Sequence, residues 1–282
     1  MTDLLKRISA VVRQAGILFL TADDPAGCVT EKTSARDLVT KYDPMVQEFL
    51  RRELLALCPD AGFFGEEEER HNIAGKERWF VVDPIDGTTN FVRDLHHSCV
   101  SVALLDREGP LLGVVYNPYA KELFTARRGA GAFLNGVRLH ATDVPLSSSL
   151  VLFGSAIYYR QTVPATLRFV QSLFPVALDF RRGGSAALDL CYLAAGRADL
   201  FFECCLQPWD YAAGCLIAQE AGCLVTALNG APLCFTHPCS VAAGGKTNHP
   251  QLLSIAARIA AEVKNGIVCG EDAADGERKE PT

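Results

Sequence analysis

The chain has 282 residues, of which 49% are hydrophobic and 21% charged, and its formal net charge is −6. This is the composition of a globular protein that can bury a sizeable core, and the negative balance disfavours a nucleic-acid-binding surface. The eleven cysteines are odd in number and include no C-x-x-C pair. We therefore expect mostly buried thiols instead of a disulfide framework.

Two helices are predicted before residue 60. Apolar residues between Leu4 and Leu18 recur at helical spacing, which predicts an amphipathic first helix. A loop is expected over Thr21–Glu31, and a second helix is expected to begin at Asp43-Pro44, with aspartate as the N-cap and proline in the first turn. No run approaches ~18 uninterrupted apolar residues, so we expect a cytoplasmic protein without a membrane span.

The most informative stretch is Trp79–Phe91, which reads W-F-V-V-D-P-I-D-G-T-T-N-F. Its first four residues predict a buried strand, which ends in a turn that carries Asp83 and Asp86. Two unpaired carboxylates ~4 Å apart would repel each other by about 4 kcal/mol at an effective dielectric of ~20, so the turn calls for a cation. Oxygen ligands favour Mg²⁺.

Two further carboxylates could have either a purely structural role or a role as metal ligands. Glu66 directly follows an apolar pair and a glycine, where its side chain can turn inward as a ligand, whereas Glu67–Glu69 is typical of a solvated surface. Asp210 stands at the start of a predicted helix, where it could be only an N-cap.

The remaining pattern divides into two halves without a linker between them. The first half ends in an antiparallel meander, in which Asn135-Gly136 is a strong tight-turn signal. The second half alternates strands and helices, which predicts an α/β layer. The predicted elements are strands 99–105, 111–116, 122–126, 132–134, 137–139, 150–153, 177–180, 199–203 and 223–227, and helices 166–173, 185–195, 210–221 and 251–263.

Three separated motifs resemble those of the inositol monophosphatase family, within the lithium-sensitive, magnesium-dependent phosphatases. Residues 83–91 match the family signature D-P-I-D-G-T-T-N-F at every position. Residues 209–214 match its W-D-x-A-A-G element, and Gly65-Glu66-Glu67 matches its acidic element. The resemblance runs from about Leu4 to Val263 and implies an αβαβα sandwich of the inositol monophosphatase/fructose-1,6-bisphosphatase type. We expect one phosphatase domain over residues 1–265 and a disordered tail over residues 266–282.

The resemblance implies a site for two or three Mg²⁺ ions. Glu66, Asp83 and the carbonyl of Ile85 would hold the first ion, and Asp83, Asp86 and Asp210 the second. The implied reaction is direct hydrolysis of a phosphate monoester by metal-activated water, without a phosphoenzyme. Glu66, Thr88 and Asp43 would be the catalytic residues that orient the water.

The resemblance also implies the substrate contacts. Gly87 and Thr88 would meet phosphate oxygens through backbone N–H groups, and Asp86 a substrate hydroxyl. The sugar side would be formed by Gly184, Ser185, Ala186, Glu203 and Ser155, and the resemblance places Lys32 and Asp37 on a mobile loop.

The expected function is hydrolysis of a sugar or polyol phosphate, chiefly myo-inositol 1-phosphate, by a lithium-sensitive homodimer. Fructose 1,6-bisphosphate, histidinol phosphate and a nucleotide 3′-phosphate are the alternative substrates. A different class of function is a regulatory protein that binds transcription or RNA machinery, although the acidic charge balance argues against direct RNA binding.

Overall fold

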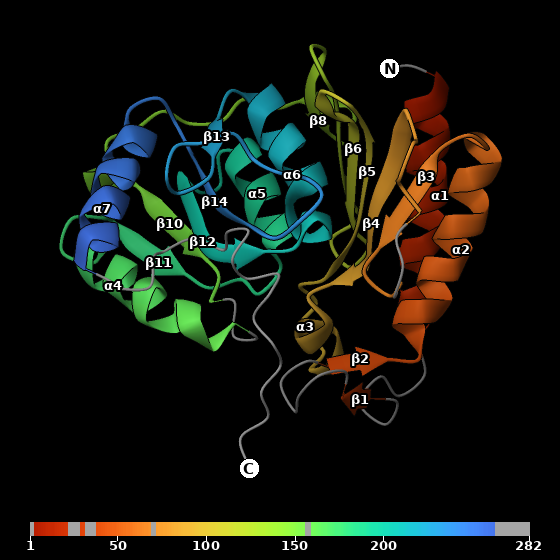
Figure 1. Ribbon diagram of the computed structural model, residues 1–282, viewed down its shortest axis with the longest axis horizontal. Helices are drawn as coiled ribbons and strands as arrows, with labels where there is room; N and C mark the ends of the chain where they lie inside the picture. Colours follow the sequence, from red (N-terminus) through yellow and green to blue (C-terminus); the bar gives the residue numbers. More distant parts are fainter. Residues whose placement is uncertain (1–2, 22–28, 32–37, 69–71, 156–158, 263–282) are drawn as a thin grey trace.

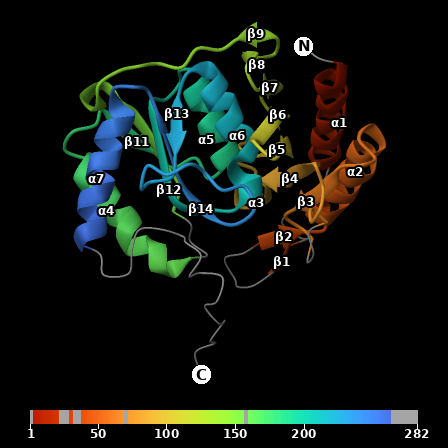
Figure 2. The same cartoon turned by 45° about the horizontal axis from the view of Figure 1, so that its top comes forward.

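In the computed structural model, which describes residues 3–21, 29–31, 38–68, 72–155 and 159–262, helices and sheets alternate in five layers (Figure 1). Helices α1 (Asp3–Leu20) and α2 (Tyr42–Leu57) cover the outer face of one sheet. Helices α5 (Ala186–Ala194) and α6 (Pro208–Ala221) lie between the two sheets, and α4 (Val163–Leu173) and α7 (Asn248–Glu262) cover the far side of the second sheet (Figure 2). The predicted αβαβα sandwich is therefore confirmed.

The first sheet has seven strands in sequence order. Its first two strands are parallel, and every later neighbour is antiparallel. The backbone φ angles of 49° at Asn135 and 85° at Gly136 fit the predicted tight turn between the last two strands. The strands are β3 (Gly62–Gly65), β4 (Arg78–Asp86), β5 (Cys99–Asp106), β6 (Gly109–Asn117), β7 (Glu122–Arg127), β8 (Gly131–Leu134) and β9 (Val137–Arg138).

The second sheet has five strands in the order β11-β10-β12-β14-β13. Strand β10 pairs in parallel with both of its neighbours, while β14 is antiparallel to β12 and β13. Strand β14 was not predicted, because C-S-V-A-A-G contains only one β-branched residue. The strands are β10 (Leu150–Phe153), β11 (Asp179–Arg181), β12 (Leu200–Leu206), β13 (Leu224–Thr226) and β14 (Cys239–Gly244).

The remaining short elements include a correction to the predicted loop before residue 32. Strand β1 (Val29–Glu31) pairs with β2 (Leu38–Thr40) in an antiparallel ribbon, so the end of that loop is a strand. The other short elements are α3 (Thr88–Val92), η2 (Leu146–Ser148) and η3 (Arg160–Thr162). The predicted loop residues Lys32 and Asp37 and the predicted tail lie outside the described residues. None of the described helices is long and apolar enough to cross a bilayer.

Helix α6 is the element that fixes the two sheets relative to each other. It is buried on nearly all sides, as expected for a helix between two sheets. Small residues allow this close packing: a Cβ on Gly214 would lie 2.9 Å from Leu190 of α5, and one on Gly113 of β6 would lie 2.9 Å from the Ala213 carbonyl oxygen. Helix α6 thereby packs closely against both α5 and the first sheet.

Candidate active site

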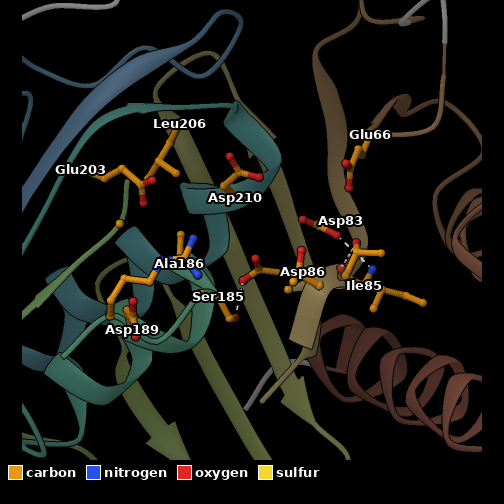
Figure 3. Close-up of a pocket in the computed structure, with 16 residues that line it drawn as sticks. Glu66, Asp83, Ile85, Asp86, Ser185, Ala186, Asp189, Glu203, Leu206 and Asp210 are labelled. Atoms are coloured by element: carbon orange, nitrogen blue, oxygen red, sulfur yellow. Dashed lines mark hydrogen bonds between the residues drawn. The ribbon is translucent and has the colours of Figure 1, made fainter. Parts of the chain in front are cut away.

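The last residues of β4 direct two carboxylates into a cavity of about 180 Å³ (Figure 3). The predicted turn at Asp83 is wrong, because β4 continues to Asp86, with a shift in register against β5 between Asp83 and Asp86. Asp83 is 3% exposed and Asp86 is 7% exposed, and the Ile85 N–H donates to Oδ1 of Asp83 across 2.9 Å. The strand ends before Gly87, whose φ of 91° is a left-handed conformation that glycine adopts without strain.

Glu66 reaches the same cavity from the neighbouring strand. Because β3 runs parallel to β4, with Gly65 opposite Val82, the residue after β3 lies beside the end of β4. The backbone N–H of Glu66 donates to the Val82 carbonyl across 3.2 Å. Gln47 of α2 holds the next residue, since its Oε1 accepts from the Glu67 N–H at 2.8 Å.

Asp210 faces the other carboxylates from the first turn of α6 (Figure 3). It is the third helical residue and not the N-cap, which is Gln207. The Gln207 N–H donates to Oδ2 of Asp210 across 2.8 Å, as in a capping box. Trp209 packs edge-on against Phe64, with ring centroids 5.5 Å apart, and so joins the start of α6 to β3.

The structure also brings Asp43 to Thr88, although 45 residues separate them. Helix α2 begins at Tyr42, so the prediction of Asp43 as an N-cap is wrong. Its carboxylate instead turns back, and Oδ2 accepts from the backbone N–H of Thr40 at 2.8 Å and from the Thr40 hydroxyl at 2.6 Å. The other oxygen faces the Thr88 hydroxyl, which lies 3.3 Å from Oδ1 and 3.2 Å from the Ile85 carbonyl.

Asp83, Asp86 and Asp210 share an arrangement in which protein groups hold one oxygen of each carboxylate. For Asp86 the held atom is Oδ2, which accepts from the Ser185 hydroxyl at 2.6 Å and from the Ala187 N–H at 2.8 Å. The Cys99 thiol donates to the same atom across 3.7 Å. Asp83 and Asp210 each carry one such bond as well, so the carboxylates are fixed in orientation while one oxygen of each stays available to a ligand.

Burial raises the pKa values of these three aspartates, and repulsion between neighbouring carboxylates adds to the effect for Asp83 and Asp210. Burial, followed by the neighbouring carboxylates, raises the pKa of Asp83 well above its usual value, and the same two causes raise the pKa of Asp210. Burial raises the pKa of Asp86 to about 6, although the Ser185 hydroxyl and the Ala187 N–H oppose the change. A bound cation would favour the ionised form of all three.

The donor set fits a hard divalent cation. Four carboxylates and the Ile85 carbonyl supply oxygen ligands of the kind that Mg²⁺ prefers. In the described part of the chain, no three acidic, histidine or cysteine side chains are already gathered closely enough to enclose an ion. Binding of a cation would therefore require the carboxylate oxygens to move closer together.

The opposite wall of the cavity comes from the second sheet and α5. Glu203 of β12 is 7% exposed and lines the cavity together with Gly184, Ser185 and Ala186. A Cβ on Gly154, which follows β10, would lie 1.8 Å from Oε2 of Glu203, so a larger residue there would displace this carboxylate. Ser155 does not line the cavity; its hydroxyl accepts from Nη2 of Arg182 at 3.4 Å.

The sequence interpretation missed several residues of this wall. Asp189 and Arg182 both line the cavity, as do Thr89 and Leu206. Asp189 is one turn into α5 and follows Ser185 by four residues, a helical spacing that could have indicated it. Burial, followed by the charge of Glu203, raises the pKa of Asp189 well above its usual value.

Asn90 joins the two walls. Its side-chain amide donates to the His97 carbonyl at 2.8 Å and to the Gly183 carbonyl at 2.9 Å. Gly87 makes a second contact between the walls, since a Cβ there would lie 3.2 Å from the Gly184 carbonyl oxygen. The end of β4, which holds Asp86, is thereby positioned against the segment that begins α5.

Comparisons with known proteins agree on one family. The model of the inositol monophosphatase family matches residues 2–261. Nus factor SuhB of Salmonella typhimurium is 38% identical over 220 residues, which are 77% of this chain and 82% of that protein. The crystal structure of the extragenic suppressor protein SuhB of Bartonella henselae has a TM-score of 0.82 at 33% identity and covers 90% of this chain and 98% of that one. An inositol monophosphatase of Thermotoga maritima has a TM-score of 0.82 at 30% identity, over 93% and 100% of the two chains.

Proposed function

Because the chain belongs to the inositol monophosphatase family, we propose that it hydrolyses a phosphate monoester with Mg²⁺, with myo-inositol 1-phosphate as the first substrate to test. The observation that carries this proposal is the set of carboxylates around one cavity, each aspartate with one oxygen held by the protein. A phosphate dianion could not approach such a cluster unless cations neutralised it.

Two or three Mg²⁺ ions are proposed for each subunit. Glu66, Asp83 and the Ile85 carbonyl would hold the first, and Asp83, Asp86 and Asp210 the second. Although Oδ1 of Asp83 accepts from the Ile85 N–H, a carboxylate has lone pairs enough on its two oxygens to serve both ions. When bound, Mg²⁺ would lower the pKa of water and stabilise the charge that develops on the phosphoryl and leaving oxygens.

The role of the chain itself would be to hold and aim the attacking water. The Thr88 hydroxyl has its hydrogen directed to Asp43 or to the Ile85 carbonyl, so its oxygen lone pairs can accept a hydrogen bond from water. Glu66 would accept a proton of the same water. A water oxygen–phosphorus bond would form as the ester bond breaks in line, and the departing alcohol would take up a proton, without a phosphoenzyme.

Substrate recognition would fall to the opposite wall. The Glu203 carboxylate suits polyol hydroxyls, and the backbone near Gly184 and Ala186 offers further polar groups at the cavity. The phosphate would meet the N–H groups of Gly87 and Thr88. A homodimer is proposed on the basis of family membership.

A Mg²⁺-dependent phosphate-release assay would test the proposal. The panel would contain myo-inositol 1-phosphate, fructose 1,6-bisphosphate, histidinol phosphate and a nucleotide 3′-phosphate, and the last three are the alternative substrates. Asp210→Asn and Glu66→Gln should lower turnover by about a hundredfold or more, because Mg²⁺ supplies several kcal/mol of transition-state stabilisation.

The matched control is Glu108→Gln, which neutralises a side chain that is 83% exposed on a surface turn and should leave turnover unchanged. Near-wild-type turnover in Asp210→Asn or Glu66→Gln would overturn the site assignment. Inhibition by Li⁺ at low Mg²⁺ is also expected, at the second ion position.

A second candidate function is favoured by the name Nus factor that the SuhB relatives carry. It is a regulatory protein that binds transcription machinery, with or without phosphatase activity. A pull-down at moderate salt, with both the wild type and Asp210→Asn as bait, distinguishes the two. Recovery of RNA polymerase components by a protein that releases no phosphate from any member of the panel would favour the regulatory function over the enzyme.

A further inference from the structure

A second cavity, of about 500 Å³, lies on the other side of the seven-stranded sheet. Side chains alternate between the faces of β7: Phe124 and Ala126 pack toward α6, whereas Leu123 packs in the cluster formed with α1. Leu123, Thr125 and Arg127 line this second cavity from the α1 side. The sheet therefore separates it from the candidate active site.

The walls of this cavity are largely apolar. Leu5 of α1 and Leu123 of β7 are buried, and the aromatic ring of Phe133 on β8 completes the wall. Its size falls within the range of ~300–1,000 Å³ that is usual for small-molecule sites. A small molecule with several carbon atoms would therefore bury apolar surface in this cavity.

Thr125 places a polar group inside these apolar walls. The residue is 3% exposed, and its hydroxyl makes no hydrogen bond to any other residue in the described ranges. The hydroxyl is not sealed off from solvent but faces the open space of the cavity, so a ligand there could form a hydrogen bond with it.

Three arginines lie in or beside the wall of this cavity. Arg13 of α1 and Arg127 of β7 line the cavity, and Arg138 of β9 lies beside it, with its guanidinium carbon 5.8 Å above the ring of Phe133. Arg13 similarly lies 5.3 Å above the ring of Tyr116. None of the three forms an ion pair with an acid in the part of the chain that the structure describes, although the protein has a net charge of −6.

We propose that this cavity binds a small amphipathic anion, an organic molecule with an apolar body and one carboxylate, phosphate or sulfonate group. The apolar body would lie against Leu5, Leu123 and Phe133, and the acid group would pair with Arg13 and Arg127. Arginine suits such a group because its guanidinium donates two parallel hydrogen bonds to a carboxylate or phosphate. The Thr125 hydroxyl would bond a polar atom of the ligand.

Fluorescence titration of the full chain with 8-anilinonaphthalene-1-sulfonate, itself an amphipathic anion, tests the proposal. The probe should bind saturably, with one site for each chain. Arg13→Gln and Arg127→Gln should each weaken binding about fivefold or more, because each removes a charged hydrogen-bonding partner. Ala130→Trp fills the cavity from an exposed turn position and should abolish binding without disturbing the core.

The control is Arg168→Gln, which removes an exposed arginine from α4 on the far side of the molecule and should leave the probe affinity unchanged. Absence of saturable binding would overturn the proposal, and so would equal affinity in all four variants. Sedimentation velocity at the same protein concentrations tests the competing occupant, a second copy of the chain. Probe binding that falls as the protein associates would show that a second copy covers the cavity, and would also overturn the proposal.

Discussion

The Ser185 hydroxyl donates a hydrogen bond of 2.6 Å to Oδ2 of Asp86, across the boundary between the first sheet and α5. Sequence similarity predicted Ser185 as a substrate contact. Ser185 lines the cavity, and its hydroxyl also holds a carboxylate that is proposed as a metal ligand.

Ser185→Ala is therefore expected to weaken Mg²⁺ binding about tenfold, the size of effect usual for partners that orient a metal ligand. Calorimetric titration with Mg²⁺ in the absence of substrate measures this directly. Ser185→Thr keeps the hydroxyl and should restore most of the affinity. Equal Mg²⁺ affinity in the alanine variant and the wild type would show that the bond does not position Asp86 for the ion.

Asn90→Asp should destabilise the fold although it barely changes side-chain size. The substitution removes both donors to the His97 and Gly183 carbonyls, and it adds a charge at a buried position. We expect a loss of about 2–4 kcal/mol in the free energy of unfolding, measured by urea denaturation. Asn229→Asp is the matched control, because its side chain only accepts a hydrogen bond, from the Ala231 N–H, which aspartate can also do. Equal losses in both variants would contradict the proposed joining role of Asn90.

Gly154→Ala should impair substrate binding and leave Mg²⁺ binding intact. The new Cβ would lie 1.8 Å from Oε2 of Glu203 and would displace that carboxylate from the cavity. The expected result is a higher KM, about tenfold, with little change in kcat, as in Glu203→Ala. The sharp test is the double variant: with Glu203→Ala already present, Gly154→Ala should add almost nothing. Additive effects on KM would show that the alanine impairs substrate binding in another way than by displacing the Glu203 carboxylate.

The metal-free protein should lose stability as the pH rises toward 6. Because burial raises the pKa of Asp86 from 3.8 to about 6, the unfolded chain releases this proton at a lower pH than the folded protein does. The protonated Asp86 side chain makes its whole favourable contribution to the free energy of unfolding below pH ~4. This contribution is lost above pH ~6, which lowers the free energy of unfolding by about 3 kcal/mol.

Comparison of the wild type with Asp86→Asn measures the contribution of this carboxylate, including its repulsion of Asp83 and Asp210. In chelator, the stability of the wild type relative to the variant should fall as the pH rises from 4 to 6.5. Saturating Mg²⁺ should remove the fall, because the ion favours the carboxylate. Parallel stability curves for the two proteins in chelator would contradict the prediction.

Local signals were sufficient to predict the apolar start of β4, but not its end. The strand was expected to break into a turn at Asp83, whereas β4 continues to Asp86, with a shift in register against β5 between Asp83 and Asp86. The tight turn at Asn135-Gly136 was predicted from its two residues alone. Strand β10 was predicted with its observed bounds for the same reason. Where a segment carries its own stop signals, its structure can be predicted without knowledge of the fold.

Contacts between distant segments could not be predicted in this way. The nearness of Asp43 to Thr88 followed only from family resemblance, and the bond from Asn90 to Gly183 was not foreseen. Strand β14 lies between β12 and β13, next to the edge strand of its sheet, and its small side chains give a weak strand signal. Such features depend on the packing of whole layers.

The single held oxygen of each aspartate also bears on which cation the site selects. A carboxylate that has given one oxygen to a protein donor is poorly placed to chelate an ion with both. Ca²⁺ commonly takes six to eight oxygens and uses bidentate carboxylates, whereas Mg²⁺ favours six ligands in an octahedron and retains several waters. At the proposed metal site, the hydrogen bonds to Asp86 and Asp210 would therefore disfavour the larger ion, because they lower the coordination number that the protein can offer.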